Sequence, residues 1–171
     1  MNNGIVDKLR IGFLVTTAII IFAAEAVPQK RDSIKPPAET ATLAETQTWL
    51  VGAIGKYAAY KTRVTTMTIT NAKFEGCSFS FTETRKSGSI STATMGATRT
   101  TNSVKEDILF DVARLASDGI SVSDHIYPEI QTLELKFADD RRIVEIVVKR
   151  EASDAIKTAL TRIQRLCTAK N

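Results

Sequence analysis

The chain has 171 residues, of which 43% are hydrophobic and 25% are charged, and its formal net charge is +4. This composition is ordinary for a folded protein and argues against a disordered chain, and the length suits a single domain. The basic residues are scattered without interleaved aromatic residues, so the sequence predicts no nucleic-acid partner.

The first 26 residues have the three-part order of an export signal. A polar start with Lys8 and Arg10 precedes an uncharged apolar run, and an Ala24-Glu25-Ala26 cleavage site follows. We therefore predict a signal peptide over residues 1–26 and an exported protein, periplasmic or extracellular. The alternative is an uncleaved membrane anchor formed by residues 11–26, although the apolar run is short beside the roughly 20 residues of a membrane span.

Residues 27–41 have the composition of a linker. They hold three of the four prolines, a cluster of charges and almost no large apolar side chains. Such a segment buries too little apolar surface to offset the entropy of ordering. We predict a flexible linker over residues 27–41 and a single α+β domain over residues 42–171.

A helix is expected to begin at Thr42. The Thr42 hydroxyl can accept from an early backbone amide while Glu45 accepts from the amide of Thr42, which is a capping box. Apolar residues then recur at helical spacing and predict one buried face: Leu43, Leu50, Ile54 and Tyr57.

Alternation of apolar and polar residues predicts strands from about Arg63 onward, with a turn at Gly76. The residues expected on the buried faces of these strands are Met67, Ile69, Cys77, Phe79 and Phe81.

The middle of the chain has weaker signals. Lys86-Ser87-Gly88-Ser89 predicts a turn. Residues 89–103 are mostly Ser, Thr, Gly and Ala, which suits either a polar edge strand or a mobile loop. Beyond them we expect a strand over Val104 to Val112, a turn at Asp118-Gly119, and a short strand over Ile120 to Ser123.

A hairpin near the C-terminus is the strongest local prediction. Apolar and polar residues alternate strictly from Leu133 to Phe137, Asp139-Asp140-Arg141 forms the tip, and a second strand follows over residues 142–149. We predict that Leu135 and Ile146 are buried and paired across this hairpin.

A second helix is expected to run from Ser153, its N-cap, to Ala169. The order helix, five or six antiparallel strands, helix predicts an α+β fold built on an antiparallel β meander, with an N-terminal and a C-terminal helix. This order resembles the PH-like barrel, which implies a curved or partly rolled sheet. The apolar face of the second helix holds Ile156, Leu160, Ile163 and Cys167.

Cys77 and Cys167 are the only two cysteines, and both lie in the exported part, where disulfides persist. Each shares the buried face of its element, so the sulfurs point into one layer if the last helix packs on that face of the sheet. We predict a disulfide between them, and the alternative is two buried thiols. A single histidine excludes a closed four-ligand Cys/His zinc site, and nucleotide-binding glycine motifs are missing, so we assign no metal and no cofactor.

Three short motifs carry a resemblance: Trp49-Leu50, Phe74-Glu75-Gly76-Cys77 and Leu166-Cys167. With them the chain resembles a group of uncharacterised bacterial exported proteins that have a Trp-Leu helix, a Phe-x-Gly-Cys turn and a C-terminal Leu-Cys helix. The resemblance would cover about residues 43–168. It implies a bacterial origin and no catalytic residue.

The histidine is the first candidate for chemistry, since His125 follows Asp124 and lies near Ser121 and Ser123. Adjacent side chains on an extended segment point apart, so Asp124 is not expected to orient His125 as a catalytic triad requires. The sequence also has no Gly-x-Ser-x-Gly turn. We assign no catalytic residue.

Two charged clusters are further candidates. Asp139 and Asp140 are too few for calcium, which needs six to eight oxygens, so a solvated turn is expected there. Basic residues at the last helix are candidates for binding an anionic head group, although a solvated helix face is the plainer interpretation: Arg150, Lys157, Arg162 and Arg165.

These observations favour a non-catalytic exported binding or interaction module for a protein or small ligand that the sequence does not identify. One alternative is a small exported enzyme whose site assembles only in three dimensions. Another is a structural accessory domain tethered to the membrane by an uncleaved anchor. A deep pocket with convergent polar groups would favour the enzyme, and a shallow apolar patch would favour the binding module.

Overall fold

The computed structural model places four stretches of the chain, residues 34–62, 64–93, 96–139 and 141–169. They belong to one compact unit, Arg31–Asn171, and the other unit of the chain is Met1–Lys30. The predicted signal peptide, and residues 27–33 of the predicted linker, lie outside the described residues.

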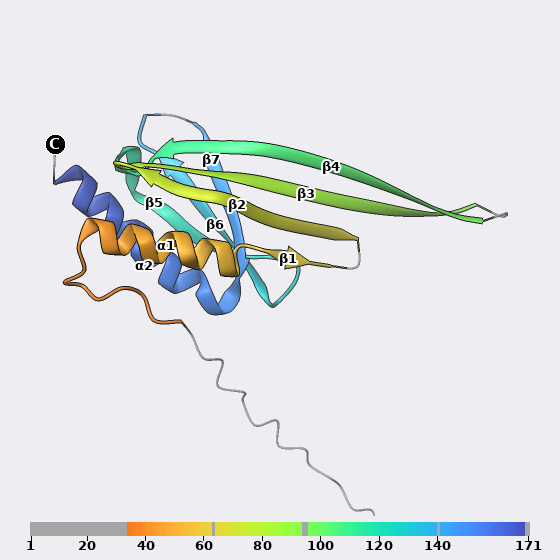
Figure 1. Ribbon diagram of the computed structural model, residues 1–171, viewed down its shortest axis with the longest axis horizontal. Helices are drawn as coiled ribbons and strands as arrows, with labels where there is room; N and C mark the ends of the chain where they lie inside the picture. Colours follow the sequence, from red (N-terminus) through yellow and green to blue (C-terminus); the bar gives the residue numbers. More distant parts are fainter. Residues whose placement is uncertain (1–33, 63, 94–95, 140, 170–171) are drawn as a thin grey trace, which may run out of the picture. The chain divides into compact units, whose positions relative to one another are not determined.

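Within the described stretches, seven strands lie between two helices in chain order (Figure 1). The α+β fold class and the two flanking helices are thereby confirmed. The elements are α1 Leu43–Tyr57, β1 Tyr60–Lys61, β2 Thr65–Glu75, β3 Ser78–Ala93, β4 Gly96–Asp111, the 3₁₀-helix η1 Val112–Arg114, β5 Leu115–Asp124, β6 Ile130–Phe137, β7 Ile143–Lys149 and α2 Arg150–Thr168.

The strands form an antiparallel meander, because spatial neighbours follow one another in the chain. One sheet has the order β1-β2-β3-β4 and the other has the order β5-β6-β7. The meander was predicted, but its division at η1 into two sheets was not, and the described residues hold seven strands where five or six were expected.

Helix α1 begins as the capping box predicts. The amide of Thr42 donates to Oε2 of Glu45 at 2.7 Å, and the amide of Glu45 donates to Oγ1 of Thr42 at 3.3 Å. The hydrogen bond from the amide of Thr42 lowers the pKa of the Glu45 carboxyl, and the hydrogen bond from the Thr42 hydroxyl lowers it further. Two amide donors of the first turn are thus satisfied locally.

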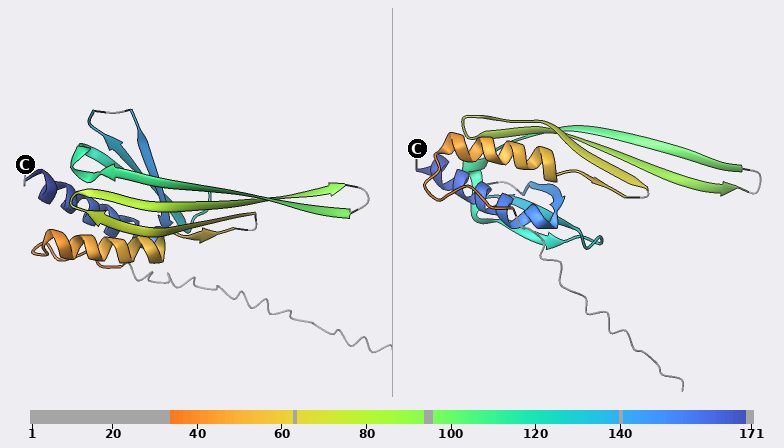
Figure 2. Two further views of the ribbon diagram at one scale, coloured as in Figure 1. Left: turned by 45° about the horizontal axis from the view of Figure 1, so that its top comes forward. Right: turned by 60° about the horizontal axis from the view of Figure 1, so that its bottom comes forward.

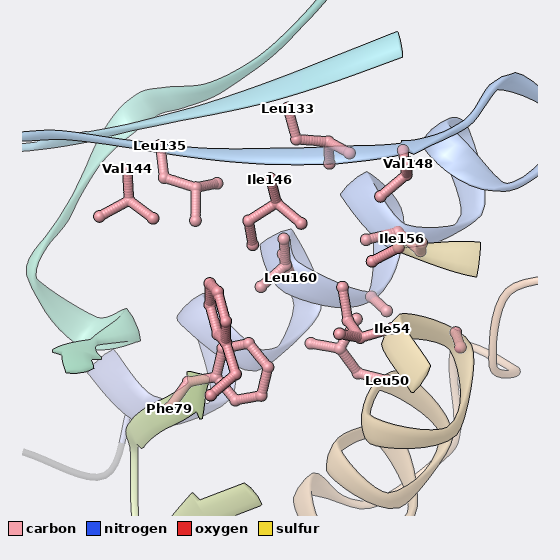
Figure 3. Close-up of a cluster of buried hydrophobic side chains, with 14 of the residues drawn as sticks. Leu50, Ile54, Phe79, Leu133, Leu135, Val144, Ile146, Val148, Ile156 and Leu160 are labelled. Atoms are coloured by element: carbon pink, nitrogen blue, oxygen red, sulfur yellow. The ribbon is translucent and has the colours of Figure 1, made fainter. Parts of the chain in front are cut away.

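The core lies between the two helices and the two sheets. Helix α1 contacts α2 and β2, while α2 also contacts β5 and β6 (Figures 1 and 2). Side chains from both helices, from β6 and β7, and from β3 point toward one another in Figure 3. Full burial of one such side chain stabilises a fold by about 1.5–3 kcal/mol. Those that are 0% exposed include Leu50, Ile54, Phe79, Leu133, Leu135, Ile146, Ile156 and Leu160.

The β6–β7 hairpin confirms the predicted burial but corrects the predicted pairing. Leu135 and Ile146 are both 0% exposed. However, Leu133 is the residue opposite Ile146, and Leu135 lies opposite Val144. Because side chains alternate with a period of two, this difference of two residues leaves every side chain on its predicted face.

Strands β3 and β4 form a long hairpin where the sequence predicted a turn. Their pairing runs without a register shift from Ser78 opposite Asp111 to Ala93 opposite Gly96. The predicted turn at Lys86-Ser87-Gly88-Ser89 is therefore wrong, and the described part of residues 89–103 is strand. Since the β2 pairing ends with Thr65 opposite Ser87, the hairpin continues beyond it as a two-stranded ribbon (Figures 1 and 2).

The turn predicted at Asp118-Gly119 is also wrong, because both residues lie inside β5. The register between β5 and β6 shifts between Leu115 and Ile120, which places a bulge there. A Cβ atom added to Gly119 would lie 2.4 Å from the carbonyl oxygen of Lys136. Glycine is needed at this position because two backbone segments approach too closely for a side chain.

Helix α2 begins three residues before its predicted start. Lys149 is the N-cap and makes no side-chain cap hydrogen bond. Ser153, the predicted N-cap, lies within the helix, and its hydroxyl is a donor shared between Oε1 of Gln131 and the carbonyl of Arg150, the latter at 2.9 Å. Ser153 therefore links α2 to β6 instead of capping the helix.

Candidate functional site

A groove of about 610 Å³ lies between the β1–β2 pair and the junction of β7 with α2. We call it the β1–α2 groove. One wall includes Ala59, Tyr60 and Met67, and the other includes Ile130, Lys149 and Glu151. Its volume falls within the range of about 300–1,000 Å³ that is typical of small-molecule sites.

The interior of the groove is apolar and its mouth is charged. Met67 and Ile130 are 0% and 2% exposed, so they lie behind the groove surface, and its accessible apolar part includes Ala59 and the ring of Tyr60. Tyr60 is half-buried and adds an aromatic ring beside them. The exposed charged residues at the mouth carry both signs: Lys61, Glu129, Lys149 and Glu151.

The short strand β1 forms one edge of the groove. Tyr60 pairs with Met67, so the two side chains are on the same face of the sheet. At the start of β2, the amide of Thr65 donates to Oγ1 of Thr62 at 2.9 Å. A strand of two residues gives no alternating pattern, and the sequence analysis did not predict it.

The opposite wall is held by Arg150. Its amide donates to the carbonyl of Glu129 at 2.9 Å, and its guanidinium donates to Oδ1 of Asp124 at 2.9 Å and to the carbonyl of Pro128. Hydrogen bonds from Gln131 and from Arg150, together with the positive charge of Arg150, lower the pKa of the Asp124 carboxyl. This network fixes the start of α2 to the loop between β5 and β6.

The histidine and its neighbours do not form a triad. Nδ1 of His125 accepts from the amide of Tyr127 at 3.3 Å, and the two rings stack with centroids 5.4 Å apart. Among the described residues, no hydrogen bond joins His125 to Asp124, Ser121 or Ser123. Nδ1 of the imidazole is engaged locally, so the site lacks the shared hydrogen bonds that activate a nucleophile.

Asp139 of the predicted hairpin tip forms an ion pair. Nη2 of Arg114 lies 2.5 Å from Oδ2 of Asp139, and this hydrogen bond lowers the pKa of the Asp139 carboxyl. Asp140 lies outside the described residues. Within the four described stretches, no three His, Cys, Asp or Glu side chains are grouped so that they could hold a metal ion.

The basic residues of α2 do not gather into one site. Nε of Arg162 donates to the carbonyl of Ala41 at 3.1 Å, which holds residues 34–41 against the helix. Arg150 and Arg165 are separated by 15 positions, or roughly 22 Å along a helix. A single anionic head group therefore cannot contact both of them.

The structure joins Cys77 and Cys167 by a disulfide, which is the pairing that the sequence predicts. Their Cα atoms are 5.9 Å apart. The bond links the turn between β2 and β3, where Gly76 adopts a φ of 61°, to the last turn of α2. Nε2 of Gln47 donates to the carbonyl of Gly76 at 2.7 Å, so α1 is tied to the same turn.

No protein-family model, curated protein or solved structure matches the chain. Its resemblance to bacterial exported proteins, and to the PH-like barrel, stays a prediction. Fold and site define the protein only as an α+β domain of two antiparallel sheets with one disulfide and an amphipathic groove. None of the helices in the described residues is both long enough and apolar enough to cross a membrane.

Proposed function

We propose that the chain is an exported, non-catalytic binding module that holds an amphipathic ligand in the β1–α2 groove. The observation that carries the proposal is the joint presence of an apolar lining and a charged mouth in one groove. A concave apolar site with a few polar groups at defined positions is the usual form of a small-ligand site.

The chemistry of the walls supports binding over catalysis. The residues that line the groove include Tyr, Met, Ile, Lys and Glu, but no described histidine, cysteine or serine lines it. Nδ1 of His125, the only histidine, accepts a hydrogen bond from the amide of Tyr127. An enzyme of the usual acyl-transfer type needs a nucleophile and a base within hydrogen-bond distance of each other.

The walls also indicate the class of ligand. The apolar part of a ligand would pack on Ala59 and on the ring of Tyr60, where it would be removed from water. Its polar end would remain at the mouth, beside Lys61 or Lys149 if anionic. A molecule with a hydrocarbon or aromatic body and one acidic group fits both regions.

Two features support export. The N-terminal residues have the order of a signal peptide, and the disulfide between Cys77 and Cys167 is of the kind that persists outside the cytoplasm.

Binding of 1-anilinonaphthalene-8-sulfonate, which has an aromatic body and one sulfonate, tests the proposal. We expect the folded protein to bind this probe saturably with a rise in fluorescence. Ala59→Trp places a large ring in the groove and should weaken binding at least tenfold. Ala44→Trp, on the exposed side of α1, is the matched control and should leave binding unchanged.

Far-ultraviolet circular dichroism and thermal unfolding of each variant show whether the fold is retained. A lack of saturable binding to the folded protein would contradict the proposal. So would equal affinities of the Ala59→Trp and Ala44→Trp variants.

A further inference from the structure

Strand β4 is the outer strand of its sheet, because the strand order there is β1-β2-β3-β4. Figures 1 and 2 show it along one long border of the sheet, extending away from both helices. The strand at the opposite border, β1, has only two residues. The sheet therefore has one long border to which a further strand can be added. No described residue of β4 lines the β1–α2 groove.

Two hydrogen bonds show which backbone groups of β4 face this border. The amide of Val112 donates to the carbonyl of Cys77 at 3.0 Å, in the same register as the β3–β4 pairs. Nη1 of Arg142 donates to the carbonyl of Leu109 at 3.2 Å. In an antiparallel pair, residues that bond to the partner strand alternate with residues whose N–H and C=O point away from it. Even-numbered residues of β4 thus bond to β3, and odd-numbered residues direct their N–H and C=O outward.

Residues 101–107 of β4 form the accessible part of this border, and we call them the β4 edge. All seven side chains are exposed. Among the described residues, no strand pairs with them on the side away from β3. The contact of Arg142 with the carbonyl of Leu109 lies just beyond the edge and marks where it ends. The outward-directed backbone groups of the edge belong to Thr101, Ser103, Lys105 and Asp107.

The β4 edge lacks most features that prevent strands from pairing. Proteins commonly protect long edges with proline, β-bulges, lysine or a covering loop. No proline occurs in residues 96–111, and the pairing with β3 has no register shift. The edge is also supported by the sheet, since Val104 pairs with Arg85 of β3, which pairs with Met67 of β2. Its one lysine, Lys105, limits which strand can lie opposite.

Val104, at the centre of the edge, indicates which strand fits. Its side chain is apolar and 62% exposed. A second β4 strand, antiparallel and related by a two-fold axis at Val104, places each Val104 opposite its copy. Because Val104 bonds to β3, the new pair is of the kind without mutual hydrogen bonds, in which Cα atoms approach to about 4.5 Å. Each valine side chain would then be covered by the other.

The charges of the edge favour the same register. It pairs every charged residue with an uncharged one: Lys105 with Ser103, Glu106 with Asn102, and Asp107 with Thr101. A two-fold axis at Lys105 or at Glu106 would place like charges directly opposite, which is destabilising. An axis at Ser103 would place Val104 opposite Asn102 and leave it without an apolar partner.

We propose that the β4 edge pairs with the β4 edge of a second copy of this chain, antiparallel and centred on Val104. The outward N–H and C=O groups of the two edges bond to each other, and the two sheets become one continuous sheet. Main-chain hydrogen bonds supply the affinity and the side chains set the register. A contact of this length is small beside a standard interface of about 1,600 Å², so the dimer should dissociate on dilution.

Sedimentation velocity of the native protein over a hundredfold range of concentration tests the proposal. We expect a reversible change from monomer to dimer. Ser103→Pro removes an amide that points outward and leaves the pairing with β3 intact, as proline allows on an edge strand. It should weaken dimerisation at least tenfold. Ser103→Ala keeps the amide, and this matched control should leave dimerisation unchanged.

Val104→Cys tests the register. The Cα separation of about 4.5 Å expected at the two-fold axis lies within the range of a disulfide. Under mild oxidation this variant should give a covalent dimer on a non-reducing gel. Thr70→Cys, at an exposed position of β2, is the control and should give none.

Far-ultraviolet circular dichroism shows whether each variant retains the fold. If Ser103→Pro does not fold, Val104→Lys takes its place. Val104 is exposed, and two lysines opposite each other repel, so this variant should also weaken dimerisation at least tenfold.

Three outcomes would overturn the proposal. The first is a monomer at every concentration, which would leave the β4 edge to an extended segment of another protein. The second is dimerisation of a folded Ser103→Pro or Val104→Lys protein that is as tight as that of Ser103→Ala. The third is a lack of cross-linking in a folded Val104→Cys protein.

Discussion

Cys77 and Cys167 are separated by 90 positions in the chain, yet their Cα atoms lie 5.9 Å apart. The bond between them closes most of the domain into one loop. In the chain-entropy model a loop of this length stabilises the fold by roughly 4 to 5 kcal/mol, although many disulfides contribute less. We expect the Cys77→Ala/Cys167→Ala variant to lose about 2–5 kcal/mol in the free energy of urea unfolding.

Dithiothreitol should shift the urea midpoint of the native protein in the same direction and leave that of the double variant unchanged. Thiol counting on denatured, unreduced protein gives an independent measurement. No reactive thiol per chain is the expected result, and two would refute the bond.

The close approach of Gly119 to Lys136 predicts a specific cost. Gly119→Ala places a Cβ atom 2.4 Å from the carbonyl oxygen of Lys136, so the strands must shift. We expect a loss of about 1–3 kcal/mol, as in other overpacked sites. Gly52→Ala is the control: nothing lies within 4 Å of its added Cβ, and it should stabilise helix α1 by up to about 1 kcal/mol. Equal effects of both substitutions on chemical unfolding would contradict this prediction.

The register of the β6–β7 hairpin predicts which core residues are coupled. Leu135→Ala and Ile146→Ala should each cost about 2–5 kcal/mol, because both side chains are 0% exposed. In double-mutant cycles, the coupling of Leu133 with Ile146 should exceed the coupling of Leu135 with Ile146, since only the first pair is directly opposite. The reverse order would restore the pairing that the sequence suggested.

The Asp124–Arg150 contact predicts a dependence on pH. The pKa of Asp124 in the folded protein lies below the 3.8 of an unperturbed aspartate. A carboxyl with a lowered pKa contributes stability above its unfolded pKa, and this contribution is lost as pH falls through the folded value. Asp124→Asn should therefore lower the urea midpoint at pH 7 and reduce its fall below about pH 4. Glu39→Gln, at an exposed position before α1, is the control and should leave both values unchanged.

The signal-peptide prediction concerns residues outside the structure. If residues 1–26 are removed during export, the mature chain begins at Val27. N-terminal sequencing and intact-mass measurement of protein recovered from the exported fraction check this. Intact Met1 on that protein would show that the segment remains as an anchor.

Local signals predicted those elements in which neighbouring residues decide the structure. The capping box at Thr42 fixed the start of α1, and strict alternation identified the strands of the β6–β7 hairpin. The ends of the β3–β4 hairpin were not predictable in this way. Gly88 and its serine neighbours have the composition of a turn, and their strand conformation depends on cross-strand pairing with β4.

Both pockets depend on long-range packing, which spacing along the chain does not indicate. Tyr60 and Glu151 are 91 positions apart and line one groove. Glu83 and Glu145 come from different sheets and line a second pocket, of about 200 Å³. The sequence shows a glutamate two positions before an arginine, Glu83 and Arg85, but it does not show that the glutamate is buried. An exposed ion pair on a strand has the same sequence pattern.

Beyond the end of β2, strands β3 and β4 continue as a two-stranded ribbon, so the length of this ribbon does not depend on packing in the core. Residues 89–93 take their cross-strand partners from residues 96–100. Removing one residue from each strand at opposite positions would preserve the register of all remaining pairs and shorten the ribbon by about 3.4 Å. Removing one residue from only one strand would shift the register of every pair on the tip side of the deletion. Changes in length at this hairpin should therefore be tolerated when they come in matched pairs.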